Sequence, residues 1–123
     1  MTSSLEKKVV IVTGGLGGIG GATARLLVEA GARVVLTDVV DGGGSELADE
    51  LCAQAGEASF APADLTEEDQ GRALVAHAVE RFGRLDGAFN NAGISQAGKP
   101  LVELTSAEFD RVMRTTCSAC SIV

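Results

Sequence analysis

Residues 13–20 read Thr-Gly-Gly-Leu-Gly-Gly-Ile-Gly, and this glycine-rich stretch decides the fold. It follows the run Val-Val-Ile-Val at residues 9–12, which is typical of a strand buried on both faces of a parallel sheet. Apolar residues then recur at helical spacing up to Gly31, which predicts a helix that ends there. A turn between such a strand and a helix presents free backbone N–H groups beside the positive helix end, so it predicts a site for a pyrophosphate.

Two glycine spacings can be read within this stretch. Gly15-x-Gly17-x-x-Gly20 matches the general dinucleotide-binding fingerprint, and Gly14-x-x-x-Gly18-x-Gly20 is a wider spacing. A kinase-type phosphate loop is excluded, because Gly-Ala follows the stretch where Lys and then Ser or Thr would be needed. A glycine-rich turn that binds no ligand is the alternative interpretation.

Three further strand patterns follow, and helix patterns alternate with them. The strands are expected at residues 33–38, 57–63 and 85–89, and the helices at residues 45–55, 66–82 and 105–113. This alternation predicts a Rossmann-type α/β fold, a doubly wound parallel sheet with helices on both sides. We expect four strands in the order 3-2-1-4.

Two of the predicted helices carry capping signals. Thr66 is expected to cap the helix after the third strand, with acids in its first turn. Residues 105–108 read Thr-Ser-Ala-Glu, which is a capping box for the last helix. The side chains of Phe109, Val112 and Met113 are expected to face inward from that helix.

Asp38 ends the second predicted strand. A carboxylate at this place can accept hydrogen bonds from the hydroxyls of an adenosine ribose and would repel a 2′-phosphate. Gly17 offers no cation that would hold that phosphate. The sequence therefore favours NAD over NADP, and a solvated loop acid is the alternative interpretation of Asp38.

With these residues in place, the chain resembles the N-terminal, cofactor-binding half of the short-chain dehydrogenase/reductase family. The resemblance runs from Lys7 to about Met113, and four motifs carry it: Thr13-Gly14-x-x-x-Gly18-Ile19-Gly20, Asp38, Asp64-Leu65 and Asn90-Asn91-Ala92-Gly93. It implies that the following residues bind the cofactor: Gly14, Leu16, Gly17, Gly18, Ile19, Gly20, Asp38, Val39, Asp64, Leu65, Asn91, Ala92 and Gly93.

The resemblance also implies individual roles. Asp64 would contact the adenine amino group, and Leu65 would flank the adenine ring. Residues 91–93 would lie along the adenosine ribose and phosphates, and Asn90 would brace the central strand. Without the resemblance, the residue types indicate only that polar groups lie at the ends of strands, which is where ligands bind in such sheets.

The family transfers hydride between a nicotinamide and an alcohol or carbonyl group, using a Tyr-x-x-x-Lys motif, an upstream Ser and an Asn. This chain has no Tyr, and its only lysines are Lys7, Lys8 and Lys99. The family's Asn aligns with Thr116, which cannot take its role unchanged. We therefore expect a dehydrogenase that is truncated before its catalytic residues, with an alcohol or carbonyl substrate only in the full-length parent. A non-catalytic dinucleotide-binding fragment or an inert product is the alternative.

We expect two segments, a Rossmann half-domain at residues 1–115 and an aberrant tail at residues 116–123. The tail departs abruptly from the family pattern. One set of codons for it, read one base out of frame, spells Asn-Val-Leu-Gly-Val-Phe, which the family often has there. The hypothesis is a frameshift near Thr115, which the downstream DNA tests, and an independently evolved or deliberately cut tail is the alternative.

Composition narrows the possible partners. Ten basic against 17 acidic residues give a net charge of −7, which disfavours nucleic-acid binding. Residues 1–8 show no apolar core of a signal peptide, so none is expected, and the apolar run at residues 9–12 falls far short of the roughly 20 residues that span a membrane. An unpaired edge on the fourth strand would favour a homo-oligomer or aggregation.

The remaining reactive side chains indicate little chemistry. Three cysteines without a secretory signal indicate reduced thiols and a cytoplasmic location. Cys117-x-x-Cys120 supplies two of the four ligands of a structural zinc site, so we expect no metal. His77 is expected at the surface or its boundary. Ser95 and Lys99 are candidates to touch nicotinamide or substrate in a complete enzyme, with an ordinary loop as the alternative.

Overall fold

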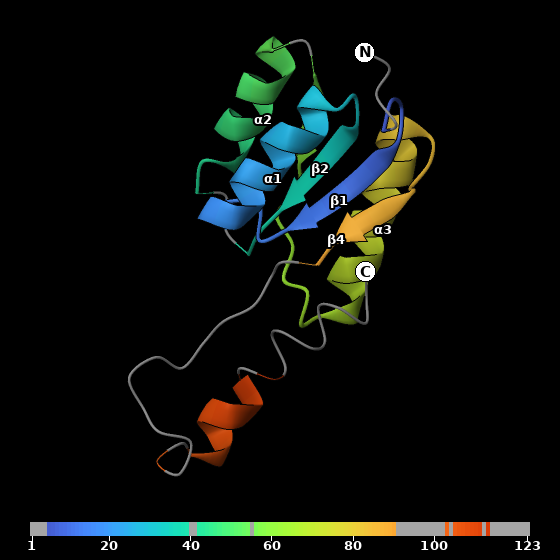
Figure 1. Ribbon diagram of the computed structural model, residues 1–123. Helices are drawn as coiled ribbons and strands as arrows, with labels where there is room; N and C mark the ends of the chain where they lie inside the picture. Colours follow the sequence, from blue (N-terminus) through green and yellow to red (C-terminus); the bar gives the residue numbers. More distant parts are fainter. Residues whose placement is uncertain are drawn as a thin grey trace.

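A computed structural model describes residues 5–39, 42–54, 56–90, 103, 105–111 and 113 of the chain. Strands and helices alternate along the chain up to residue 89 (Figure 1). They are β1 (Val9–Thr13), α1 (Gly18–Glu29), β2 (Arg33–Thr37), α2 (Gly44–Ala53), β3 (Glu57–Phe60), α3 (Glu68–Phe82) and β4 (Gly87–Phe89).

The strands form one parallel sheet in the order β3-β2-β1-β4, which confirms the predicted fold class and strand order. Helices α1 and α2 lie on one face of the sheet and α3 on the other (Figure 1). Ile11 points into the core beneath α3, and its neighbour Val12 points into the core beneath α1 and α2. Because both faces are covered, both positions must be apolar, and this explains the uninterrupted β-branched run.

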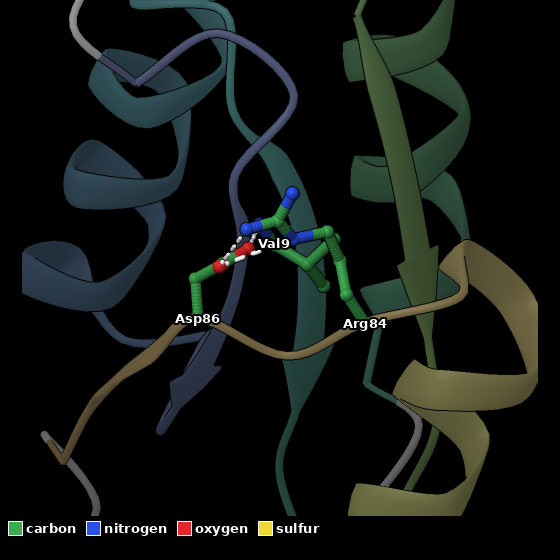
Figure 2. A network of polar contacts seen from close by, with 3 residues as sticks. All are labelled: Val9, Arg84 and Asp86. Atoms are coloured by element: carbon green, nitrogen blue, oxygen red, sulfur yellow. Dashed lines mark hydrogen bonds and ion pairs between the residues drawn. The ribbon is translucent and has the colours of Figure 1, made fainter.

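The start of β4 is tied to the start of β1 through one acid (Figure 2). Asp86 accepts a hydrogen bond from the Val9 backbone N–H at 2.8 Å and another from Arg84 Nε at 3.1 Å. The Asp86 N–H in turn donates to the Val9 carbonyl at 2.9 Å. The Arg84 guanidinium, followed by the Val9 N–H, holds the pKa of Asp86 below its usual range. At the other end of these strands, Thr13 Oγ1 donates to the Phe89 carbonyl at 3.3 Å.

The end of β3 and the start of α3 differ from the predicted ones. β3 ends at Phe60 and not at residue 63, although Ala61 N–H and Ala63 N–H still donate to the carbonyls of Leu36 and Asp38. Pro62, which lies between those two donors, has no N–H to give. Glu67, not Thr66, is the N-cap of α3.

The prediction for the last helix was wrong in one respect. Residues 106–111 and 113 are helical, as expected. The side chains of Phe109 and Met113 are 48% and 43% exposed, however, so they do not face a core. Helical periodicity shows that one face is apolar, but it does not show what covers that face. Val112 lies outside the residues that the structure describes.

Candidate functional site

The glycine-rich turn connects the carboxyl end of β1 to the start of α1. Gly14 has a φ of 64°, a conformation that side chains disfavour. Gly20 lies so close to this turn that a Cβ on it would be 2.2 Å from the Gly14 carbonyl oxygen. A Cβ added to Gly18 would meet nothing within 4 Å. The fold therefore requires glycine at positions 14 and 20, whereas Gly18 leaves open space above the turn.

The N-terminus of α1 is suited to an anion. Gly17 is its N-cap, no side chain caps it, and its first turn holds no acid. The first backbone N–H groups of a helix have no partner within the helix, and they sit at the positive end of its dipole. Ile19, in this first turn, is 68% exposed. The turn thus presents uncapped N–H groups beside open space, which is what a phosphate needs.

Asp38 lies beside this turn and faces it. Its Oδ2 accepts a hydrogen bond from the Leu16 N–H at 3.3 Å, and its Oδ1 accepts one from the Val39 N–H at 2.8 Å. The turn is held to β2 a second time, because Gly15 N–H donates to the Thr37 carbonyl at 3.0 Å. The Val39 side chain is 62% exposed at the same place. An acceptor group and an apolar surface therefore lie next to the glycine-rich turn.

Asp64 follows β3 at the same end of the sheet. Its Oδ1 accepts hydrogen bonds from the Thr66 N–H at 3.0 Å and from Thr66 Oγ1 at 2.6 Å. The Thr66 hydroxyl and then the Thr66 N–H lower the pKa of Asp64, because both favour the ionised form. The Asp64 N–H donates to Gln70 Oε1 at 2.7 Å. The side chain of Leu65 is 6% exposed and lies in the core with Val35.

Sequence reasoning missed the roles of Thr66 and Gln70. The residue pattern Asp-x-Thr contains a usable signal, because acids accept hydrogen bonds from backbone groups two residues later in tight turns. Asn90 was expected to brace the central strand. Its side chain is exposed, and the tie between β1 and β4 at this end comes from Thr13.

Several candidate residues lie outside the part that the structure describes: Asn91, Ala92, Gly93, Ser95, Lys99, Thr116, Cys117 and Cys120. Within the described part, no group of three or more His, Cys, Asp or Glu side chains is placed to hold a metal ion. His77 is half-buried and its Nε2 is 2.9 Å from Ser59 Oγ, so it lies at the surface boundary, as predicted. Cys52 is an exposed free thiol that donates to the Ala58 carbonyl.

The uncapped start of α1 and the carboxylates of Asp38 and Asp64 lie at the carboxyl edge of one parallel sheet. The family model described as short chain dehydrogenase matches residues 8–122. This chain belongs to the short chain dehydrogenase family. Members of that family are oxidoreductases, and the family assignment confirms the resemblance seen in the motifs.

Individual short chain dehydrogenases are similar over nearly the whole chain. The 2,5-dichloro-2,5-cyclohexadiene-1,4-diol dehydrogenase of Sphingobium indicum is 45% identical over 111 residues, which are 90% of this chain and 43% of that protein. A crystal structure of a short chain dehydrogenase from Mycobacterium smegmatis has a TM-score of 0.90 and 36% identity, and covers 98% of this chain and 51% of its own.

A third relative was solved with a cofactor. The 3-ketoacyl-(acyl-carrier-protein) reductase from Brucella melitensis, complexed with NADH, has a TM-score of 0.88 and 32% identity, and the match covers 97% of this chain and 48% of that one. The chain therefore spans about half or less of the length of these relatives. Among the residues that the structure describes, no helix is long and apolar enough to span a membrane.

Proposed function

We propose that this chain binds NAD, with the pyrophosphate at the N-terminus of α1 and the adenosine beside Asp38 and Asp64. The observation that carries the proposal is the uncapped start of α1 next to Asp38, whose carboxylate accepts the Leu16 N–H of the same turn. The open space above Gly18 accommodates the phosphates without a clash. The NADH complex of the related reductase supports a nicotinamide cofactor.

The choice of NAD over NADP rests on Asp38. A carboxylate at this position attracts the hydroxyls of the adenosine ribose, and it repels a phosphate attached to the 2′ oxygen. The neighbouring turn offers backbone N–H groups and no cationic side chain, because residues 14–20 contain only glycine, leucine and isoleucine. Val39, exposed beside Asp38, provides apolar surface for the adenine ring.

The whole protein that contains this sequence is proposed to transfer hydride between nicotinamide and an alcohol or carbonyl substrate, as the family assignment supports. The present 123 residues contain no tyrosine. The acid-base step of the family relies on one, so the chain by itself is proposed to bind the cofactor without turnover. We further propose a cytoplasmic location, with reduced thiols, of which Cys52 is free.

Fluorescence titration tests this function. NADH added to the purified chain should show enhanced nicotinamide emission that saturates, and NADPH should bind at least about ten-fold more weakly, the equivalent of about 1.4 kcal/mol. Assays of NAD reduction with simple alcohols should show no turnover. Absence of saturable NADH binding contradicts the proposal, and turnover contradicts the inference drawn from the missing tyrosine.

A further inference from the structure

We propose that a hollow lined by Arg33, Arg81 and Cys52 is a thiolation site, at which the thiol exchanges with a negatively charged peptide disulfide of the glutathione class. The hollow lies at the amino edge of the sheet, at the opposite end of the strands from the glycine-rich turn. It shares no residue with the proposed cofactor site, so it does not depend on the proposed function.

The hollow forms where two helices end beside an edge strand. Helices α2 and α3 lie on opposite faces of the sheet (Figure 1), and β3 pairs with β2 alone in the described part of the chain. Gly56, just before β3, cannot carry a side chain, because a Cβ there would be 2.1 Å from Val28 Cγ1. A space of about 330 Å³ is left between the end of α2, the start of β3 and the end of α3. Small-molecule sites typically measure about 300–1,000 Å³.

Cys52, in the last turn of α2, brings a nucleophile to this hollow. Its side chain is exposed and its thiol is free. Its Sγ donates to the Ala58 carbonyl at 3.3 Å, so the thiol lies against the edge of β3. A thiol must be accessible and ionised to attack a disulfide. Cys52 is accessible, and its ionisation gives up a weak S–H hydrogen bond.

The charged side chains of the hollow favour a negatively charged reactant. Arg33 Nε lies 2.5 Å from Glu57 Oε2, and the Arg33 side chain is 30% exposed. Arg81 has no ion-pair partner among the described residues, and its guanidinium lies 5.8 Å from the centre of the Phe82 ring. Two guanidinium groups and one carboxylate therefore line the hollow, whereas the whole chain carries a net charge of −7.

A glutathione-type disulfide matches these groups. Each half carries carboxylates, which guanidinium groups bind in a bidentate way. Each half also carries an ammonium group, which the Glu57 carboxylate can accept. Because the carboxylates of the disulfide outnumber its ammonium groups, the field of the whole chain repels it. Any preference for it must therefore come from the arginines of the hollow.

The exchange step needs no further oxidant. The Cys52 thiol loses its proton to solvent, and its sulfur attacks one sulfur of the disulfide. The S–S bond of the reactant breaks, a new S–S bond forms to Cys52 Sγ, and the other half leaves as a thiolate that takes up a proton. The sulfur of Cys52 is thereby oxidised, and the departing sulfur is reduced. The product has no S–H group, so α2 loses its hydrogen bond to the Ala58 carbonyl.

The test compares the rates at which glutathione disulfide and cystamine, a cationic disulfide, modify the chain. Cys117→Ser and Cys120→Ser are introduced together, so that mass spectrometry follows Cys52 alone. The reference is the ratio of the same two rates for this chain unfolded in urea, because unfolding removes the hollow and keeps the charge. We expect folding to raise the ratio in favour of glutathione disulfide by about five-fold, the upper range for exposed charge pairs, and high salt to reduce this advantage.

Substitutions of Arg81 test its charge directly. Arg81→Ala should reduce the advantage by about three-fold, and Arg81→Glu by about ten-fold. Arg72→Ala, at an exposed arginine of the same helix that pairs with Glu68, is the matched control and should leave the advantage unchanged. Circular dichroism checks that each variant is folded.

Two results overturn the proposal. One is a ratio for the folded chain that is equal to or below that of the unfolded chain. The other is an advantage that Arg81→Glu leaves unchanged. Should the Arg81 variants fail to fold, the comparison of the folded with the unfolded chain decides alone.

Discussion

Gly18 and Gly20 occupy the same turn and have different reasons to be glycine. A Cβ at Gly20 would approach the Gly14 carbonyl oxygen to 2.2 Å, so the backbone itself requires glycine there. A Cβ at Gly18 would meet no protein atom within 4 Å. The fold therefore does not require glycine at position 18, and we propose that a bound ligand does.

Two alanine variants check this distinction. Gly18→Ala should weaken NADH binding by about ten-fold or more while the free energy of unfolding stays the same. Gly20→Ala should lower the free energy of unfolding by about 2–3 kcal/mol, because the turn must move to admit the methyl group. Urea denaturation and NADH titration measure the two effects. A Gly18→Ala chain that is destabilised but binds normally would contradict the assignment.

At the scale of single residues, sequence reasoning proposed Gly18, Asp38 and Asp64 because each follows a strand or opens a helix, and position along the chain reveals this. It did not identify Gln70 or the role of Thr66. Their contacts depend on how the loop after β3 folds back on the start of α3, and no periodic pattern records such a fold.

Among the elements, β1 pairs with both β2 and β4, and the acid just before β4 contributes to this pairing. Asp86 accepts hydrogen bonds from the Val9 N–H and from Arg84, and its pKa lies below the usual range because of them. A group whose pKa is lowered by folding stabilises the folded state at pH values above its ordinary pKa. That stabilisation is lost as the pH falls through the lowered value.

Asp86→Asn should therefore be less stable than the unmodified chain at pH 7. The difference in the free energy of unfolding should shrink as the pH falls below the ordinary aspartate pKa of about 3.9. Denaturation series at several pH values measure it. Glu29→Gln, at an exposed acid of α1, controls for the loss of one negative charge. A stability difference that stays constant down to acidic pH would show that the charge of Asp86 is not involved.

The order of elements was predictable because hydrophobic patterns report burial. Runs such as residues 9–12 are apolar at every position, and that happens only where helices cover both faces. The ends of elements were less predictable. β3 ends at Phe60, close to Pro62, and the apolar face that contains Phe109 is exposed. A periodic pattern shows neither where a strand stops pairing nor what covers the apolar face of a helix.

At the scale of the whole molecule, β4 forms one edge of the four-stranded sheet. Within the described residues, β4 pairs with β1 alone, and Ala88 at its centre is exposed. An unpaired strand edge is a template for another strand. Because the net charge of −7 opposes contact between copies, salt should strengthen association by screening that charge.

We expect the chain to self-associate in a concentration-dependent way in light scattering after size exclusion, and more so at high salt. Ala88→Lys should shift it toward the monomer, since a charge on an edge strand opposes pairing. Ala76→Lys, at an exposed position of α3, is the matched control and should have no such effect. A monodisperse monomer at all concentrations would contradict this expectation.

The two backbone links between the glycine turn and β2 have a thermodynamic consequence. Gly15 N–H and Leu16 N–H hold the turn to Thr37 and Asp38, so folding itself orders the surfaces proposed for phosphate and for ribose, and orders them as one unit. A ligand that reaches both then loses less conformational entropy of the protein than one that must assemble the site. The binding surfaces proposed at this edge of the sheet are thus preorganised before a nucleotide binds.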